Sequence, residues 1–138
     1  MSNTYMARRM ERLSAESAAL TVDLPQFQVY DIHDPDKAFV AGWERSSANR
    51  YDYQFLLVLP EGYPEERPLL YISQPRPLYR FDGTRLPELS HDFHTWGRGG
   101  DGQTQICHCP ADGWDPWRSC VAVMLRGLLW VSLYEKHL

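Results

Sequence analysis

The chain has 138 residues, of which 43% are hydrophobic and 13% aromatic, and its formal net charge is −4. This length suits one globular domain, residues 1–138, with its own core. The mild acidity gives no electrostatic basis for binding nucleic acid, and no stretch approaches the roughly 18 apolar residues of a membrane span. The start of the chain lacks the apolar segment of a signal peptide, and there are only three cysteines, so we expect a reducing, cytoplasmic setting.

The first regular pattern predicts an N-terminal helix over residues 3–20. Met6, Met10 and Leu13 recur at spacings of four and three residues, which places them on one helical face. Pro25 lacks the backbone N–H that a continuing helix needs, so the helix should end before it.

Four strands are predicted next, because stretches rich in aromatic and β-branched residues alternate with turn-forming residues. The first strand begins at Phe27, and the other three cover residues 37–45, 51–59 and 69–73. In the stretch 51–59, Phe55 and Leu57 share one side while Leu56 and Val58 share the other. Both faces are therefore expected to be covered, as in a central strand.

Regular patterning fails between residues 75 and 113, and about forty irregular residues in a compact domain are typical of a functional loop. A C-terminal helix is predicted after it, with Asp115 as N-cap and Pro116 at the first position. We expect Gly127 to allow this helix to pack closely on the sheet. Its predicted buried stripe consists of Val121, Met124, Leu125, Leu128, Leu129 and Ser132. The predicted fold is α+β: a helix, a four-stranded antiparallel meander, a long irregular segment that carries the active site, and a helix packed on the sheet.

The most informative motif is Gln-Ile-Cys-His-Cys-Pro at residues 105–110, which is followed by Trp-Asp-Pro at 114–116. It places the Cys107 thiol at the end of a short apolar step, just before a loop. No Lys or Arg lies within five residues of Cys107, and the adjacent His108 should point to the opposite side of an extended segment. Such an unactivated thiol, with the ordinary cysteine pKa of about 8.5, suits a carrier that receives an already activated acyl group.

Three motifs in this order resemble the ubiquitin-conjugating enzyme family. Residues 59–68 (Leu-Pro-Glu-Gly-Tyr-Pro-Glu-Glu-Arg-Pro) look like the Tyr-Pro loop that leads into the family's fourth strand. Residues 102–107 (Gly-Gln-Thr-Gln-Ile-Cys) look like its step into the catalytic cysteine, two residues longer here, and residues 114–116 look like its Trp-Ser-Pro. The resemblance covers nearly the whole chain and implies that Cys107 accepts a protein C-terminus as a thioester.

The chain departs from the family before the cysteine. The usual His-Pro-Asn is replaced by His-Asp-Phe-His-Thr-Trp at residues 91–96, in which His94 fills the His position and is our second candidate catalytic residue. No Asn occurs between Arg50 and Cys107, so oxyanion support falls to a backbone N–H, to the partner, or to a nearby side chain. The side-chain candidates are Gln103, Thr104 and Gln105.

The chain ends at Leu138, where the family normally adds two further helices. This combination looks like the compact bacterial relatives found beside nucleotidyltransferases in antiphage signalling operons (CBASS). That resemblance implies a partner whose C-terminus is conjugated to a target amine, either a nucleotidyltransferase or a ubiquitin-like protein, with or without an adenylating activating enzyme. We expect no cofactor and no metal. Asp112 and Asp115 are candidates for deprotonating the amine.

Local alternatives remain for the residues around the thiol. Cys109 is an alternative nucleophile, and Cys107 is alternatively a buried strand cysteine. A zinc site formed by Cys107, His108 and Cys109 with His91 or His94 is disfavoured, because adjacent ligands diverge in an extended segment and no Cys-x-x-Cys pair exists. Cys120 is expected in the core, Trp114 and Trp117 are expected to anchor the helix start, and residues 97–102 are expected to form a flap over the thiol.

Two other classes of function remain open. One is a catalytically inactive ubiquitin-conjugating-like module that only binds a partner. The other is a thiol hydrolase of the papain type, which needs its cysteine at a helix N-terminus. Cys107 is expected about ten residues before the helix, which argues against the hydrolase.

Overall fold

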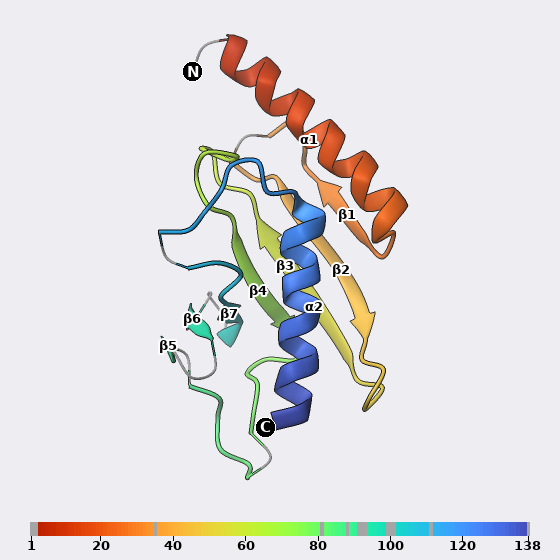
Figure 1. The fold of residues 1–138 in the computed structure, drawn as a ribbon, viewed down its shortest axis with the longest axis vertical. Coiled ribbons are helices and arrows are strands. Elements are labelled where there is room, and N and C mark those ends of the chain that lie inside the picture. The colour runs from red at the N-terminus through yellow and green to blue at the C-terminus, as the bar shows by residue number, and fades with distance from the viewer. Residues whose placement is uncertain are drawn as a thin grey trace.

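The computed structural model describes residues 3–34, 36–80, 82–87, 89–90, 94–98, 102–110 and 112–137. The elements run in the order α1 (Asn3–Asp23), β1 (Phe27–Tyr30), β2 (Phe39–Arg45), β3 (Asp52–Val58), β4 (Leu69–Gln74), β5 (Leu89–Ser90), β6 (Thr95–Arg98), β7 (Thr104–Ile106) and α2 (Cys120–His137) (Figure 1). The predicted α+β class, with a helix at each end and an antiparallel sheet between them, is confirmed.

The sheet is larger than predicted. In the described part of the chain it has seven strands, in the order β1-β2-β3-β4-β7-β6-β5, and every neighbouring pair is antiparallel. Strands β1 to β4 are the predicted meander, whereas β5, β6 and β7 lie in the segment predicted to be irregular. These three strands have two to four residues each, which is too short for an alternating pattern, and they form because β4 offers an edge of unpaired backbone groups.

Helix α2 crosses one face of the sheet, and α1 lies near β1 at the end of the sheet where α2 begins (Figure 1). Gly127 of α2 faces β3 and β4: a Cβ atom at this position would lie 3.1 Å from the Leu70 side chain and 3.3 Å from that of Phe55. The prediction that Gly127 permits close packing is therefore confirmed. Phe55 and Leu57 are fully buried under this helix layer.

Helix α2 begins later than predicted. Ser119, rather than Asp115, is its N-cap: the Ser119 hydroxyl accepts the N–H of Ala122 at 3.0 Å. Asp115 instead accepts the N–H of Trp117 at 2.9 Å, which closes a separate turn before the helix. Asp and Ser are both good caps, so the local sequence did not decide between the two positions.

The buried face of α2 is rotated relative to the predicted stripe. Met124 is buried as expected, but Leu125 and Leu129 are about half exposed, and Ser132 is exposed. The helix is apolar on several sides, so its periodicity fitted two neighbouring faces equally well. The residues that are buried are Cys120, Val123, Met124, Gly127, Trp130, Val131 and Glu135.

The second face of the sheet is only partly covered. Leu56 and Val58 of β3 are half-buried, and Trp43 of β2 is 51% exposed, so the expectation that both faces of β3 are covered is wrong. β3 is nevertheless central, between β2 and β4. In the parts of the chain that are described, neither helix combines the length and the hydrophobicity needed to cross a membrane.

Candidate active site

Cys107 directly follows β7, at the point where this strand leaves the sheet. The last regular pair places Ile106 of β7 opposite Leu70 of β4. Beyond it, the His108 ring nitrogen Nε2 lies 2.7 Å from the carbonyl oxygen of Pro68. The segments before β4 and after β7 therefore stay side by side past the end of the sheet.

The residues of this segment are buried alternately. Thr104, Ile106 and His108 are buried, whereas Gln105, Cys107 and Cys109 are half-buried. Alternation of this kind means that Cys107 and Cys109 share one side of the extended chain and that His108 points to the other. The predicted divergence of His108 from the two thiols is thus confirmed, and the reading of Cys107 as a fully buried strand cysteine is not supported.

His94 lies next to Cys107 through the main chain. The N–H of Cys107 donates a hydrogen bond of 2.8 Å to the carbonyl oxygen of His94, and the following pair, Thr95 and Ile106, joins β6 to β7. The His94 side chain is exposed, and its backbone has a positive φ of 53°. The structure therefore brings the two predicted catalytic residues together, while a chemical role for the His94 imidazole stays a prediction.

The charge near the thiols comes from arginines that are distant in sequence. Burial raises the pKa of the Cys107 thiol, and the positive charge of Arg67 opposes this rise. Burial also raises the pKa of Cys109, against which Arg67 and Arg118 both act. Sequence reasoning missed these cations because it searched only near Cys107 in the chain. The signal that could have found Arg67 is its position in the Tyr-Pro loop, just before the strand that pairs with β7.

His108 is held as a neutral imidazole on the core side. Its ring stands perpendicular to that of Trp114, with centroids 5.7 Å apart, and burial lowers the pKa of His108. With Nε2 donating to the Pro68 carbonyl oxygen, the buried Nδ1 is left without a hydrogen-bond partner in the described structure. Protonation of His108 would place the second ring proton on this buried nitrogen, where no hydrogen-bond partner receives it. The charged imidazolium is therefore disfavoured, which explains the lowered pKa of His108.

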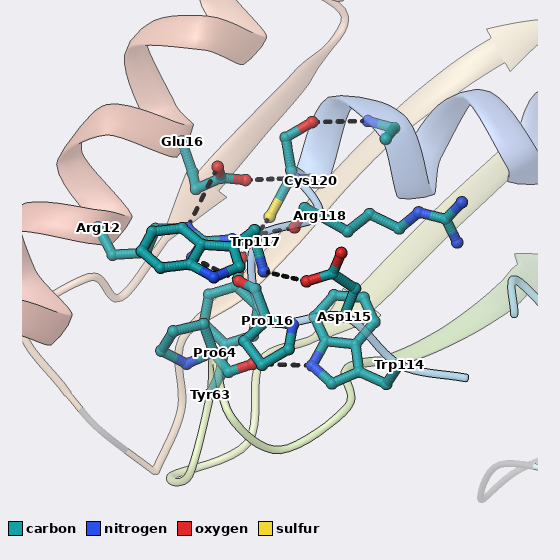
Figure 2. Close-up of polar contacts among 12 residues, drawn as sticks. Arg12, Glu16, Tyr63, Pro64, Trp114, Asp115, Pro116, Trp117, Arg118 and Cys120 are labelled. Atoms are coloured by element: carbon teal, nitrogen blue, oxygen red, sulfur yellow. Dashed lines mark hydrogen bonds and ion pairs between the residues drawn. The ribbon is translucent and has the colours of Figure 1, made fainter. Parts of the chain in front are cut away.

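The loop after the thiols is held by hydrogen bonds from its own Trp114 to the backbone of the Tyr-Pro loop and from Arg12 of α1 (Figure 2). Trp114 donates its indole N–H to the carbonyl oxygen of Pro64 at 2.8 Å. Arg12 of α1 donates to the carbonyl oxygens of Pro116 at 2.6 Å and Arg118 at 2.9 Å. The thiols consequently stand beside a rigid loop, although the backbone there has little regular structure.

The third cysteine, Cys120, lies in the core as predicted, with 1% of its surface exposed. Its N–H donates to the carboxylate of Glu16, and its sulfur lies 3.4 Å from the Tyr63 hydroxyl (Figure 2). Burial raises the pKa of the Cys120 thiol strongly, so this residue does not compete with Cys107 and Cys109 as a nucleophile.

The two tryptophans expected to anchor the helix start behave differently. Trp114 is half-buried against the core, as predicted. Trp117 is 88% exposed, so its predicted anchoring role is wrong. The Asp115 turn directs Trp117 outward. Arg12 donates hydrogen bonds to the backbone carbonyl oxygens of the residues on either side of Trp117.

The remaining candidates are placed as follows. Asp112 and Asp115 are both exposed, and Asp115 is engaged by the N–H of Trp117. Of the candidates for oxyanion support, Thr104 is buried while Gln103 and Gln105 are half-buried. His91 and part of the predicted 97–102 flap lie outside the described residues. Within the described residues, no group of three or more His, Cys, Asp or Glu side chains is arranged to hold a metal ion.

Comparisons with known proteins add no identity to this picture. Neither a family model, nor a curated protein, nor a solved structure matches the chain.

Proposed function

We propose that this protein is a ubiquitin-conjugating-like transferase that carries a protein C-terminus as a thioester on Cys107 and passes it to an amine. The observation that supports this most is the position of Cys107. It is half-buried at the end of a strand, with its backbone held by His94 and with Arg67 near its sulfur.

The reaction has two displacement steps. The Cys107 thiolate attacks the acyl carbon of an activated C-terminus, forming a C–S bond while the bond to the donor's leaving group breaks. The target amine then attacks the same carbon, so that a C–N bond forms, the C–S bond breaks and the thiolate is released. The proton lost by the amine passes to a carboxylate, for which Asp112 and Asp115 remain the candidates, or to solvent.

A thiol whose pKa is raised by burial fits a carrier better than a hydrolase. The papain type of site needs a cysteine at a helix N-terminus, where the helix end helps to form the thiolate. Here the cysteine at the start of α2 is Cys120, which is buried. Cys107 follows a strand instead, and this favours acyl transfer over hydrolysis.

The acyl donor follows from the resemblance to compact bacterial ubiquitin-conjugating-like proteins. We propose the C-terminus of a nucleotidyltransferase in cytoplasmic antiphage signalling, with a ubiquitin-like protein as the other source. An adenylating enzyme would supply the activated form where one is present. Cys107 and Cys109 are only half-buried, which leaves part of each residue accessible to an extended C-terminal tail.

The test uses a synthetic peptide with a C-terminal glycine activated as a small-molecule thioester. Incubation with the intact protein should give one adduct per chain, detected by mass spectrometry and removed by dithiothreitol. Cys107→Ala should abolish the adduct, and the matched variant Cys109→Ala should retain it. An adduct that survives in Cys107→Ala but not in Cys109→Ala would move the nucleophile to Cys109, and no adduct in any form would refute the transferase.

A catalytically inactive binding module is the second candidate function. It is favoured by the exposure of two large aromatic side chains, Trp43 at 51% and Trp117 at 88%. For such a module the wild-type protein would form no thioester, and Cys107→Ala would bind the same partner with unchanged affinity.

A further inference from the structure

Arg67 lies on the same side of the sheet as the two half-buried thiols. The antiparallel register places Leu70 opposite Ile106. Continuing it by three residues places Arg67 opposite Cys109. The pair that lies between these two pairs, Pro68 and His108, is in contact: the His108 ring nitrogen Nε2 lies 2.7 Å from the Pro68 carbonyl oxygen.

Residues opposite each other in an antiparallel pair project from the same face, and a long side chain also reaches the diagonal neighbour. For Arg67 the direct neighbour is Cys109 and the diagonal neighbour is Cys107. Arg67 is half-buried, so water screens its charge less than it would at a fully exposed position. Its positive charge acts on both thiols.

The positive charge of Arg118 influences fewer residues of this site than that of Arg67. Its guanidinium Nη1 lies 3.4 Å from the carbonyl oxygen of His108, and its charge influences Cys109 and His108. Among the described residues, only Arg67 influences all three residues from 107 to 109.

We propose that Arg67 is the anion-stabilising residue of the thiol site, favouring negative charge on the Cys107 sulfur and on the acyl oxygen as the thioester forms. The acyl-oxygen part of this inference rests on the proposed transferase function. When the thiolate adds to the acyl carbon, the carbonyl π electrons move to the oxygen, and the guanidinium N–H groups donate to that oxyanion. Collapse of the oxyanion then expels the donor's leaving group and leaves the thioester on Cys107.

The first experiment measures charge selectivity without any acyl donor. In the Cys109→Ala background, Cys107 is treated with a dianionic aromatic disulfide (5,5′-dithiobis-2-nitrobenzoate) and with a neutral one (dithiodipyridine). The measured quantity is the rate constant for the dianionic reagent divided by that for the neutral reagent. Replacing Arg67 with Gln should lower this ratio about tenfold, because a cation that attracts the dianionic reagent to the sulfur is lost. Arg67→Lys should restore most of the ratio, and added salt should reduce it in the wild-type sequence.

The control is Arg126→Gln, which removes an exposed arginine from α2 and should leave the ratio unchanged. Circular dichroism verifies that each variant is folded. The ratio changes only if the positive charge of Arg67 acts next to the Cys107 sulfur, because a loss of structure or of thiolate slows both reagents equally. An unchanged ratio in folded Arg67→Gln protein would therefore overturn the inference.

The second experiment follows thioester formation from the activated peptide in the same variants. Arg67→Gln should lower the maximal rate of adduct formation about a hundredfold, the lower end of the effect of removing one oxyanion donor. The peptide concentration that gives the half-maximal rate should change less. If wild-type protein is acylated and Arg67→Gln matches it, Arg67 does not stabilise the oxyanion. If wild-type protein is never acylated, the transferase proposal fails together with the acyl-oxygen part, and the reagent ratio alone decides whether the positive charge of Arg67 acts next to the Cys107 sulfur.

Discussion

At the scale of single residues, the three cysteines differ in how far solvent reaches their sulfur atoms. Cys120 is buried next to Tyr63 and Glu16, whereas Cys107 and Cys109 are half-buried on one side of an extended segment. Burial raises the pKa of each thiol, and Arg67 opposes the rise only for the half-buried pair. The reactivity of the chain should therefore be confined to these two positions.

This environment predicts the pH dependence of Cys107 reactivity. The thiolate is the reacting form, so a raised pKa means that less of it is present at neutral pH than in an unfolded peptide. In Cys109→Ala protein, alkylation by iodoacetamide should be slower than for a cysteine peptide at about pH 7.5 and should reach half its maximal rate above about pH 8.5. Mass spectrometry of samples quenched over this range gives the profile, and a midpoint below the free-cysteine value would contradict the burial argument.

At the scale of elements, the contact between α1 and the start of α2 sets where the second helix begins. The Glu16 carboxylate accepts the N–H of Cys120, the first residue of α2, and lies 3.4 Å from the Arg12 guanidinium. Arg12 in turn takes the carbonyl oxygens of Pro116 and Arg118. Backbone groups at and just before the helix start are thus satisfied by side chains of another element, as helix ends require.

Replacing Glu16 with Ala should lower the free energy of unfolding by about 2–3 kcal/mol. The substitution leaves the Cys120 N–H and the largely buried Arg12 without this acceptor, and an unsatisfied buried group is costly. Urea denaturation followed by circular dichroism measures the loss. The matched control is Glu11→Ala, which removes an exposed carboxylate from the same helix and should change stability by less than about 0.5 kcal/mol. Equal effects of the two substitutions would show that the Glu16 contact contributes little.

At the scale of the whole molecule, α1 joins two loops that are far apart in the sequence. Arg9, which is 2% exposed, donates to the carbonyl oxygens of Pro60 and Tyr63 in the Tyr-Pro loop. Trp114 then links the Tyr-Pro loop to the segment after the thiols. The candidate site is consequently built on a junction of three separate segments.

The buried His108 at this junction makes global stability depend on pH. Its folded-state pKa is lowered by burial, so the unfolded chain binds a proton more readily than the folded one. The stability that neutral His108 provides is complete above the unfolded pKa of about 6.5 and decreases as the pH falls from there towards the folded pKa.

Urea unfolding at about pH 7.5 and about pH 5.5 should therefore show a smaller acid-induced loss in His108→Gln than in the wild-type chain. The His33→Gln variant changes an exposed histidine and should lose as much stability as wild type. A His108→Gln protein with the full wild-type loss would show that another group carries the pH dependence.

The sequence by itself determined the elements whose signals are local. Helical spacing and Pro25 gave α1, which ends at Asp23, and alternation with turn residues gave strands β1 to β4. The order of motifs around Cys107 singled out the thiol and led to the transferase proposal, which remains a prediction. These features depend on neighbouring residues along the chain, so the pattern of side chains is enough to indicate them.

Only the tertiary structure decided the features that depend on pairing between distant segments. Strands β5 to β7 form because β4 supplies backbone partners, and α2 begins at Cys120 because Arg12 and Glu16 take the backbone groups at its start. Arg67 reaches the thiols through the register of β4 with β7, across a separation in sequence that no local pattern reports. Contacts of this kind depend on where the chain folds back on itself, which is fixed by the packing of the whole core rather than by any one segment.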